Sequence, residues 1–384
     1  MNINWNYPTA MRTGEGRISE IADFCKEFGM SSPLLVTDPG LAQLPMVGTI
    51  IKLCSNAGLK IRLFSAIKPN PTGSNVDNGI KEYLKGDHDG IIALGGGSGL
   101  DAGKAIAVAA NQDCSMWDLE DVGDNWLNAD PDRIPPIIAV PTTAGTGSEV
   151  GRASVIVNEE EERKAIIFHP KMLPDCVILD PELTIGLPSM LTAATGMDAL
   201  SHSLEAFCSP VYHPMAEGIA VEGIRVVSQF LERAVSNGND IEARRQMLVA
   251  SSMGATAFQR GLGAMHALAH PLGAIYDAHH GTLNAVLMPY VLQANRSAIE
   301  QPITRLARYL ELTPDFDGFL QWILDLRTSI KIPNTLEELG IDDRRLKDLG
   351  EMAVADPSAG TNPIQHDATT YSRIASNALN GNLE

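Results

Sequence analysis

IIALGGGSGLDAGK, residues 91–104, combines three local patterns in one short stretch. The apolar run at its start predicts a buried strand, the glycines predict a tight turn, and the residues after Gly99 have helical spacing. Glycines let a backbone come close to a phosphate, and the N-terminus of the following helix offers free N–H groups and the positive end of the helix dipole. The stretch therefore predicts a strand–loop–helix cradle that suits a pyrophosphate.

Other interpretations of this stretch fit less well. A P-loop requires G-x-x-x-x-G-K-[ST], and the GK at 103–104 would need glycine at 98 and a hydroxyl residue at 105, where the chain has serine and alanine. The Rossmann fingerprint nearly fits as Gly97-x-Gly99-x-x-Ala102, which is weak evidence by itself. A tight turn without a ligand needs fewer glycines than the stretch contains.

The rest of the first half repeats the alternation of strand and helix. Candidate strands lie at 33–36, 60–64, 90–94 and 136–140. Candidate helices lie between them, at 46–57, 75–84 and 102–110. Such alternation is typical of parallel βαβ units, in which helices cover both faces of the sheet.

The pattern changes after about Pro188, because only helical spacing follows. The helical stretches there are 189–207, 215–237, 241–259 and 262–274. We therefore expect an α/β N-terminal domain with a parallel, Rossmann-like sheet at 1–185 and an all-α C-terminal domain at 186–384.

Size and composition exclude several classes of protein. A chain of 384 residues is long enough for two domains, and its net charge of −18 disfavours binding to nucleic acid. Five scattered cysteines without a C-x-x-C pair predict buried, reduced thiols rather than disulfides or a zinc cluster. No secretory signal pattern and no long apolar run is found, so we expect a cytoplasmic protein that does not span a membrane.

A second polar glycine loop, PTTAGTGSE at 141–149, follows the candidate strand at 136–140. Its hydroxyls and N–H groups suit a ribose and a nicotinamide, and two such loops on neighbouring strands favour a dinucleotide. Asp38 follows the first candidate strand, where a carboxylate can bind the adenosine ribose and repel a 2′-phosphate. Asp38 therefore favours NAD over NADP, although a turn aspartate before Pro39 is an equally good interpretation.

The helical half contains a cluster of metal-binding side chains. Asp198 and His202 are four residues apart and share one face of a helix, and so do His266 and His270. Two further histidines follow at 279 and 280. One carboxylate with several imidazoles suits Fe(II) or Zn(II). Histidines satisfied within the core are the alternative, which is weakened because unpaired charges in alanine-rich helices are costly.

These motifs resemble those of the iron-containing (group III) alcohol dehydrogenases, which are related in fold to dehydroquinate synthase and glycerol dehydrogenase. The matching stretches are GGGSGLDAGKA (95–105), PTTAGTGSEV (141–150), ATGMDALSHSLEA (194–206) and GLGAMHALAHPLGAIYDAHHGTLNAVLMP (261–289). Residues 357–363 resemble the C-terminal segment of the family, so the similarity spans essentially the whole chain.

The resemblance implies a role for each matching residue. The implied metal ligands are Asp198, His202, His266 and His280. His270 matches a histidine near the nicotinamide that relays a proton, and His279 is given no metal role. The implied cofactor contacts are Asp38, Gly95, Gly96, Gly97, Ser98, Asp101, Thr142, Thr143, Ser148 and Lys164.

The function implied by the resemblance is an oxidoreductase that transfers a hydride between NAD(H) and a small alcohol or aldehyde, with the substrate oxygen bound to Fe(II) or Zn(II). An NAD- and metal-dependent carbon–oxygen lyase of the dehydroquinate synthase type is the alternative. A non-catalytic metal- or nucleotide-binding module is a third. Family members commonly form dimers or larger homo-oligomers.

Two arginines depart from the uncharged residues that many family members carry nearby. We hypothesise that Arg152 or Arg260 pairs with a carboxylate, sulfonate or phosphonate of an anionic aldehyde. Ordinary salt bridges in an acid-rich protein are the alternative, and we favour that alternative.

Overall fold

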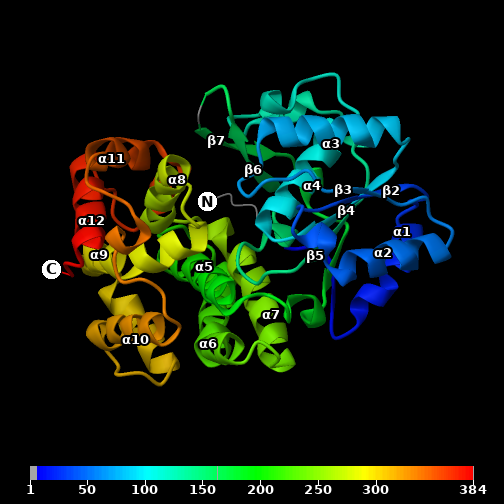
Figure 1. Cartoon of the computed structure of the whole chain (residues 1–384). Helices are drawn as coiled ribbons and strands as arrows, with labels where there is room; N and C mark the ends of the chain where they lie inside the picture. Colours follow the sequence, from blue (N-terminus) through cyan, green and yellow to red (C-terminus); the bar gives the residue numbers. More distant parts are fainter. Residues whose placement is uncertain (1–6, 162, 384) are drawn as a thin grey trace. The chain divides into compact units, whose positions relative to one another are not determined.

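The computed structural model describes residues 7–161 and 163–383. Its internal contacts divide the chain into two compact units, Tyr7–Gly186 and a second unit that begins at Leu187 (Figure 1). The first unit contains a parallel sheet and the second is helical, so the expected fold class is confirmed.

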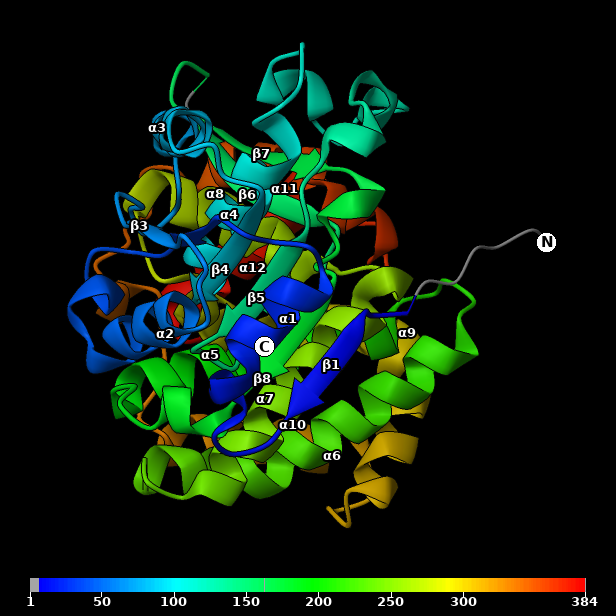
Figure 2. The same ribbon diagram turned by 90° about the vertical axis from the view of Figure 1, so that its right-hand side faces the viewer.

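The first unit is built on a six-stranded sheet whose paired neighbours all run parallel (Figure 2). In spatial order its strands are β1 (Ala10–Thr13), β8 (Cys176–Leu179), β5 (Ile137–Pro141), β4 (Gly90–Gly95), β2 (Pro33–Val36) and β3 (Arg62–Phe64). The central strands β4 and β5 are buried at every residue, which explains their continuous apolar sequence. The candidate strand at 33–36 is β2, and those at 90–94 and 136–140 lie within one residue of β4 and β5.

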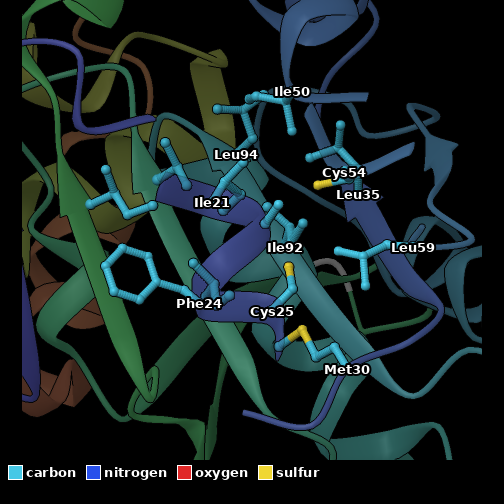
Figure 3. Packing of buried hydrophobic residues seen from close by; sticks show 14 of the residues in the cluster. Ile21, Phe24, Cys25, Met30, Leu35, Ile50, Cys54, Leu59, Ile92 and Leu94 are labelled. Carbon is cyan, nitrogen blue, oxygen red and sulfur yellow. The ribbon is translucent and has the colours of Figure 1, made fainter. Parts of the chain in front are cut away.

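Helices cover this sheet because alternate residues of each strand point to opposite faces. Ile92 and Leu94 of β4 pack with α1 (Ile21–Glu27) and α2 (Pro45–Asn56) in one apolar cluster (Figure 3). Ala93 faces α4 (Gly97–Ala109) instead, and α3 (Gly73–Lys85) packs beside α4.

An antiparallel hairpin, which the sequence analysis did not predict, follows the second glycine loop. It consists of β6 (Ala153–Asn158) and β7 (Arg163–Phe168). Alternate residues of β6 are buried, as expected for a strand that packs through one face. Each of its strands has only six residues, so the alternation of buried and partly exposed side chains gives a weak signal in the sequence.

The second unit has eight α-helices and no strand among its described residues, 187–383. They are α5 (Ser189–Cys208), α6 (Pro214–Ser236), α7 (Ile241–Ala257), α8 (Ala264–Tyr276), α9 (His280–Tyr309), α10 (Phe316–Ser329), α11 (Leu346–Ala355) and α12 (Ala368–Asn380). Helix α5 is buried at every residue from Thr192 to Phe207, so it is the central helix of this unit. Within the described part of the chain, no helix is both long and apolar enough to cross a membrane.

The contact between α4 and the sheet predicts a destabilising mutation. A Cβ at Gly103 would lie 2.7 Å from the Cβ of Ala93, closer than two carbon atoms can approach. We expect Gly103→Ala to lower the free energy of unfolding by about 1–3 kcal/mol, because α4 must move away from β4. Gly48→Ala in α2 is the matched control, since nothing lies within 4 Å of its new methyl group, and it should leave stability equal or up to about 1 kcal/mol higher. Urea unfolding followed by circular dichroism measures both changes, and an equally stable Gly103→Ala protein would contradict this packing.

Candidate functional site

Three of the predicted metal ligands converge in the interior of the helical unit. Asp198 and His202 lie one turn apart on α5, and His266 lies in the first turn of α8. One ligand atom from each of the three lies within 4.8 Å of the other two, and all three residues are buried. The i, i+4 spacing on α5 therefore does place carboxylate and imidazole on one face, and α8 supplies the third group.

His280 lies beside this group at the first residue of α9. Its Nε2 is 3.7 Å from Oδ1 of Asp198, and its side chain is 28% exposed, so it lies on the more accessible side. Asn284, one turn later on α9, was missed in the sequence analysis. Its Nδ2 lies 3.0 Å from Oδ1 of Asp198, 3.2 Å from Nε2 of His266 and 3.1 Å from Nε2 of His280. Two signals could have indicated it: its spacing of four from a predicted ligand and its place within the family-matching stretch 261–289.

The charges of this group suit a divalent cation. Burial alone would raise the pKa of Asp198, but the imidazoles of His202, His280 and His266 and the amide of Asn284 lower it to about 2. Burial lowers the pKa of His266 well below its usual value, and His202 and His270 lower it further, so this imidazole is neutral and has a lone pair to donate. The Nδ1 of His202 and the Oδ1 of Asn284 are buried without a hydrogen-bond partner in the described residues. The carboxylate of Asp198, the neutral imidazole of His266 and the unpartnered Nδ1 of His202 together fit Fe(II) or Zn(II).

Two glycines allow α9 and α7 to pack closely against α5. A side chain at Gly281 would collide with the carbonyl oxygen of Ala194 on α5. A Cβ at Gly254 of α7 would lie 2.9 Å from the carbonyl oxygen of Ala199 and 3.1 Å from the Cβ of His202. The glycine after His280 is therefore required by packing between α9 and α5.

His270 lies one turn after His266 on α8 and is oriented by a carboxylate. Its Nδ1 is 2.8 Å from Oδ2 of Asp356, and its ring stacks on that of His280 with centroids 5.4 Å apart. The other oxygen of Asp356 accepts the N–H of Ser358 at 2.8 Å. Burial opposes ionisation of Asp356, but contacts with His270 and Ser358 lower its pKa overall. Asp356 was not predicted from the sequence, although it lies next to residues 357–363, which resemble the C-terminal segment of the family.

The first glycine loop connects the end of β4 to the start of α4 by a tight turn. Gly95 ends β4 with φ 142°, which favours glycine, and α4 begins at Gly97. A Cβ at Gly99 would lie 2.7 Å from the carbonyl oxygen of Leu94, so this position also needs glycine. Asp38 lies beside this loop, with Oδ1 accepting the N–H groups of Gly40 and Leu41 at 2.8 and 2.9 Å. Its Oδ2 lies 3.9 Å from the place that a Cβ of Gly95 would occupy.

The second loop lies directly against the first. The N–H of Thr142 donates to the carbonyl oxygen of Gly95 at 2.9 Å. The side chain of Thr143 lies 3.3 Å from the place of a Cβ on Gly96, and that of Thr146 is closer still to Gly97. Hydroxyl groups therefore adjoin the turn that follows β4.

Asp101 and Ser148 have a structural role that the sequence analysis did not foresee. Ser148 donates its hydroxyl to Oδ1 of Asp101, and Oδ2 of Asp101 accepts the N–H of Val155 at 2.9 Å. Lys104 is completely buried, and its Nζ donates to the carbonyl oxygen of Ser148 at 2.9 Å and lies 3.4 Å from Asp101. Helix α4 thus holds the second loop in place through these three side chains.

The remaining predicted site residues have partners elsewhere. Lys164 lies on β7 and donates to Oδ1 of Asn70 at 3.0 Å. Arg260 donates to the carbonyl oxygens of Val211 and Phe207 at 2.7 and 3.0 Å, and its NH1 lies 3.1 Å from Glu217. These contacts do not favour Arg260 as the anion-binding group, because its guanidinium already stabilises the end of α5.

Arg152, the other arginine of the anion hypothesis, lies at the start of the β6–β7 hairpin. Its guanidinium is 5.5 Å from the centre of the Phe168 ring. It also lowers the pKa of Asp121, which burial raises overall. The guanidinium of Arg152 therefore lies near the carboxylate of Asp121 and the ring of Phe168.

Comparison with known proteins gives concordant results for both halves of the chain. A family model described as "Iron-containing alcohol dehydrogenase" matches residues 8–181, and one described as "Fe-containing alcohol dehydrogenase family, C-terminal" matches residues 192–379. The 4-hydroxybutyrate dehydrogenase of Cupriavidus necator is 36% identical over 383 residues, covering 97% of this chain and 99% of its own.

Solved structures resemble the chain over the same length. The structure of a 1,3-propanediol oxidoreductase is 34% identical, with a TM-score of 0.93, and the match covers 99% of this chain and 100% of that one. The structure of sulfoacetaldehyde reductase from Bifidobacterium kashiwanohense in complex with NAD+ is 30% identical, with a TM-score of 0.88, covering 98% and 99%. The chain is therefore an alcohol oxidoreductase that belongs to the iron-containing alcohol dehydrogenase family.

Proposed function

We propose that this enzyme transfers a hydride between NAD(H) and a small alcohol or aldehyde, with a divalent ion, Fe(II) or Zn(II), in the helical unit. The observation that carries this proposal is the buried group of Asp198, His202 and His266 with His280 beside it. A group of one carboxylate and three imidazoles is a donor set for these ions. We assign dinucleotide binding to residues 1–185 and metal binding to residues 186–384.

The four proposed ligands would hold the ion and keep water away from it on the buried side. When bound, the ion supplies a Lewis acid for the substrate oxygen, and the nicotinamide supplies the hydride chemistry. Asp198 contributes a negative charge in an apolar environment, where its attraction to a cation is strong. Neutral His266 contributes a lone pair without repelling the cation.

His270 is the proposed proton-transfer residue. Asp356 accepts a hydrogen bond from Nδ1 of His270, so the proton-carrying nitrogen is held on that side and Nε2 remains able to accept or release a proton. Its side chain is 23% exposed, which leaves a path for proton exchange with solvent. This arrangement of a histidine and a carboxylate resembles the acid–base pairs of many enzymes.

NAD is the proposed cofactor, bound by the two adjoining loops. Gly95, Gly96, Gly97 and Ser98 would hold the pyrophosphate at the start of α4. Thr142 and Thr143 would contact the cofactor from the second loop, whereas Asp101 and Ser148 would act by holding that loop. Lys164 is a further proposed contact with the cofactor. The carboxylate of Asp38 beside the first loop supports NAD over NADP, and NAD+ is bound in the related sulfoacetaldehyde reductase.

The relatives support proposals about the substrate class and the assembly of this enzyme. The relatives named above act on alcohols or aldehydes, and none is a lyase, so the dehydroquinate synthase-type alternative is not favoured. The names 4-hydroxybutyrate dehydrogenase and sulfoacetaldehyde reductase show that two of these relatives act on anionic compounds. We predict that Arg152 binds an anionic substrate. We also predict that the chain forms a homo-oligomer and that it is located in the cytoplasm.

Removal of a metal ligand tests the proposed function directly. We expect His266→Ala to lower affinity for Zn(II) by at least about 100-fold and to abolish NADH oxidation by short aldehydes, because a buried ligand is lost. His279→Ala is the matched control, because His279 lies next to His280 but is exposed and has no proposed metal role. Metal content after dialysis and absorbance at 340 nm measure both effects. Equal metal content in wild type and His266→Ala would contradict the proposed site.

The role of Asp38 can be tested by cofactor preference. We expect Asp38→Gly to raise the ratio of catalytic efficiencies with NADPH and NADH by at least about 10-fold, because the charge that repels a 2′-phosphate is removed. Steady-state kinetics with both cofactors measures this ratio. An unchanged ratio would mean that Asp38 serves only the turn at Gly40 and Leu41.

The role of Asp356 can be separated from metal binding. We expect Asp356→Asn to lower kcat by about 10- to 100-fold, because His270 loses the carboxylate that orients it. The amide can still accept the N–H of Ser358, so the fold and the metal content should be unchanged. Turnover measured on metal-loaded protein, together with metal analysis, tests this expectation, and wild-type turnover in the variant would exclude the role.

A further inference from the structure

Glu205 is a buried carboxylate to which neither the sequence analysis nor the proposed mechanism assigns a role. It lies on α5 one turn after His202, and it is 5% exposed. Its side chain extends to the N-terminal end of α8, the helix that carries His266 and His270. A buried carboxylate costs free energy unless donors surround it, so its partners indicate its role.

The hydrogen-bond partners of the Glu205 side chain among the described residues lie at the start of α8. Oε2 is 2.6 Å from Nδ1 of His266 and accepts the N–H of Gly263 at 2.9 Å. Oε1 accepts the N–H of Met265 at 2.6 Å. A Cβ at Gly263 would lie 3.0 Å from Oε1, so the glycine makes room for the carboxylate. One side chain thus binds both the imidazole and the backbone of the residues next to it.

The contact with the imidazole fixes which nitrogen of His266 carries the proton. A neutral imidazole has one N–H donor and one lone-pair acceptor. Both oxygens of Glu205 already accept backbone N–H groups, so the side chain acts as an acceptor toward the ring as well. The proton of His266 therefore lies on Nδ1, and the lone pair lies on Nε2. The Nε2 faces the ligand group, 3.2 Å from Nδ2 of Asn284, which itself contacts Asp198. Glu205 therefore presents the lone pair of His266 to the place where the ligands converge.

The contacts with the backbone hold His266 in position. The first N–H groups of a helix have no partner within the helix, and a carboxylate there also interacts favourably with the helix dipole. Glu205 takes the N–H groups of Gly263 and Met265, and Oδ1 of Asn362 takes that of Ala264 at 3.0 Å. The start of α8 is therefore fixed by two side chains, of which only Glu205 also contacts His266.

We propose that Glu205 is a positioning residue for the metal centre: it selects the Nδ1–H tautomer of His266 and fixes the start of α8, and it thereby sets the affinity of the site for a divalent ion. This proposal rests on the proposed metal-binding function of Asp198, His202, His266 and His280. Hydrogen bonds from a ligand histidine to a carboxylate typically change metal affinity by about 10- to 100-fold when they are removed.

Glu205→Gln tests the proposal because it keeps the shape of the side chain. Its single amide oxygen can replace only one of the two carboxylate oxygens. At the place of Oε1 it leaves the NH2 group against Nδ1 of His266 and the N–H of Gly263, so the proton must move to Nε2. At the place of Oε2 it leaves the NH2 group against the N–H of Met265, so the start of α8 is no longer held. We expect Zn(II) affinity, measured by competition with a chelating dye, to fall by about 10- to 100-fold. The visible absorption of Co(II)-loaded protein should weaken and shift, because the coordination changes.

Two control variants separate positioning from a general loss of structure. Asn362→Ala removes the other cap of α8 without touching His266, so it should change Zn(II) affinity by less than about threefold. Glu232→Gln removes one negative charge at an exposed position of α6 and should leave affinity unchanged. An affinity for Glu205→Gln within about threefold of wild type, or an equal loss in Asn362→Ala, overturns the proposal.

A measurement on the wild-type protein does not depend on folding of the variant. The ¹⁵N chemical shifts of His266 in Zn(II)-loaded protein, assigned by comparison with His266→Ala, should show Nδ1 protonated and Nε2 bound to the ion. A protonated Nε2 overturns the role of Glu205. Equal Zn(II) binding by wild type and His266→Ala instead contradicts the proposed metal site itself, so the two failures are distinguishable.

Discussion

The burial of Asp198 is the constraint on which the helical unit depends. A carboxylate that is 2% exposed among alanine-rich helices is tolerated only if positive or polar groups surround it. Its surrounding groups come from α5, α8 and α9, so these helices must approach closely at one point. Gly281 allows α9 to approach α5, because a side chain there would collide with the carbonyl oxygen of Ala194, and Gly254 allows α7 to pack against α5 in the same way. The same packing that satisfies Asp198 therefore brings the imidazoles together.

A buried charge has a comparable role in the first unit. Lys104 is 1% exposed, and burial lowers its pKa, while Asp101 favours its charged form. Its Nζ binds the carbonyl oxygen of Ser148, and Asp101 binds the hydroxyl of the same residue. Helix α4 therefore begins at one glycine loop and holds the other. Lys104 thus binds the backbone of the second loop.

The sequence predicted those features that depend on local spacing. The central strands follow from continuous apolar runs, and Asp198, His202 and His266 follow from helical spacing together with the family motifs. The sequence did not predict Glu205, Asn284 and Asp356 as partners, because their contacts depend on tertiary packing. Glu205 is 61 residues from His266, and Asp356 is 86 residues from His270. The contacts of Arg260 also depend on tertiary packing. Its partners are a carbonyl oxygen at the end of α5 and the carboxylate of Glu217, and charge alone does not identify them.

This division between local and distant residues has a chemical consequence. Spacing along a helix decides which ligand types are available, but it does not decide which nitrogen of an imidazole carries its proton. Each of the two histidines on α8 has its Nδ1 against a carboxylate from another part of the chain, Glu205 for His266 and Asp356 for His270. Both rings therefore have Nε2 available, one buried with the ligand group and one more exposed. Two histidines one turn apart can then serve different purposes, one as a ligand and one for proton transfer, because burial and neighbours differ although the tautomer is the same.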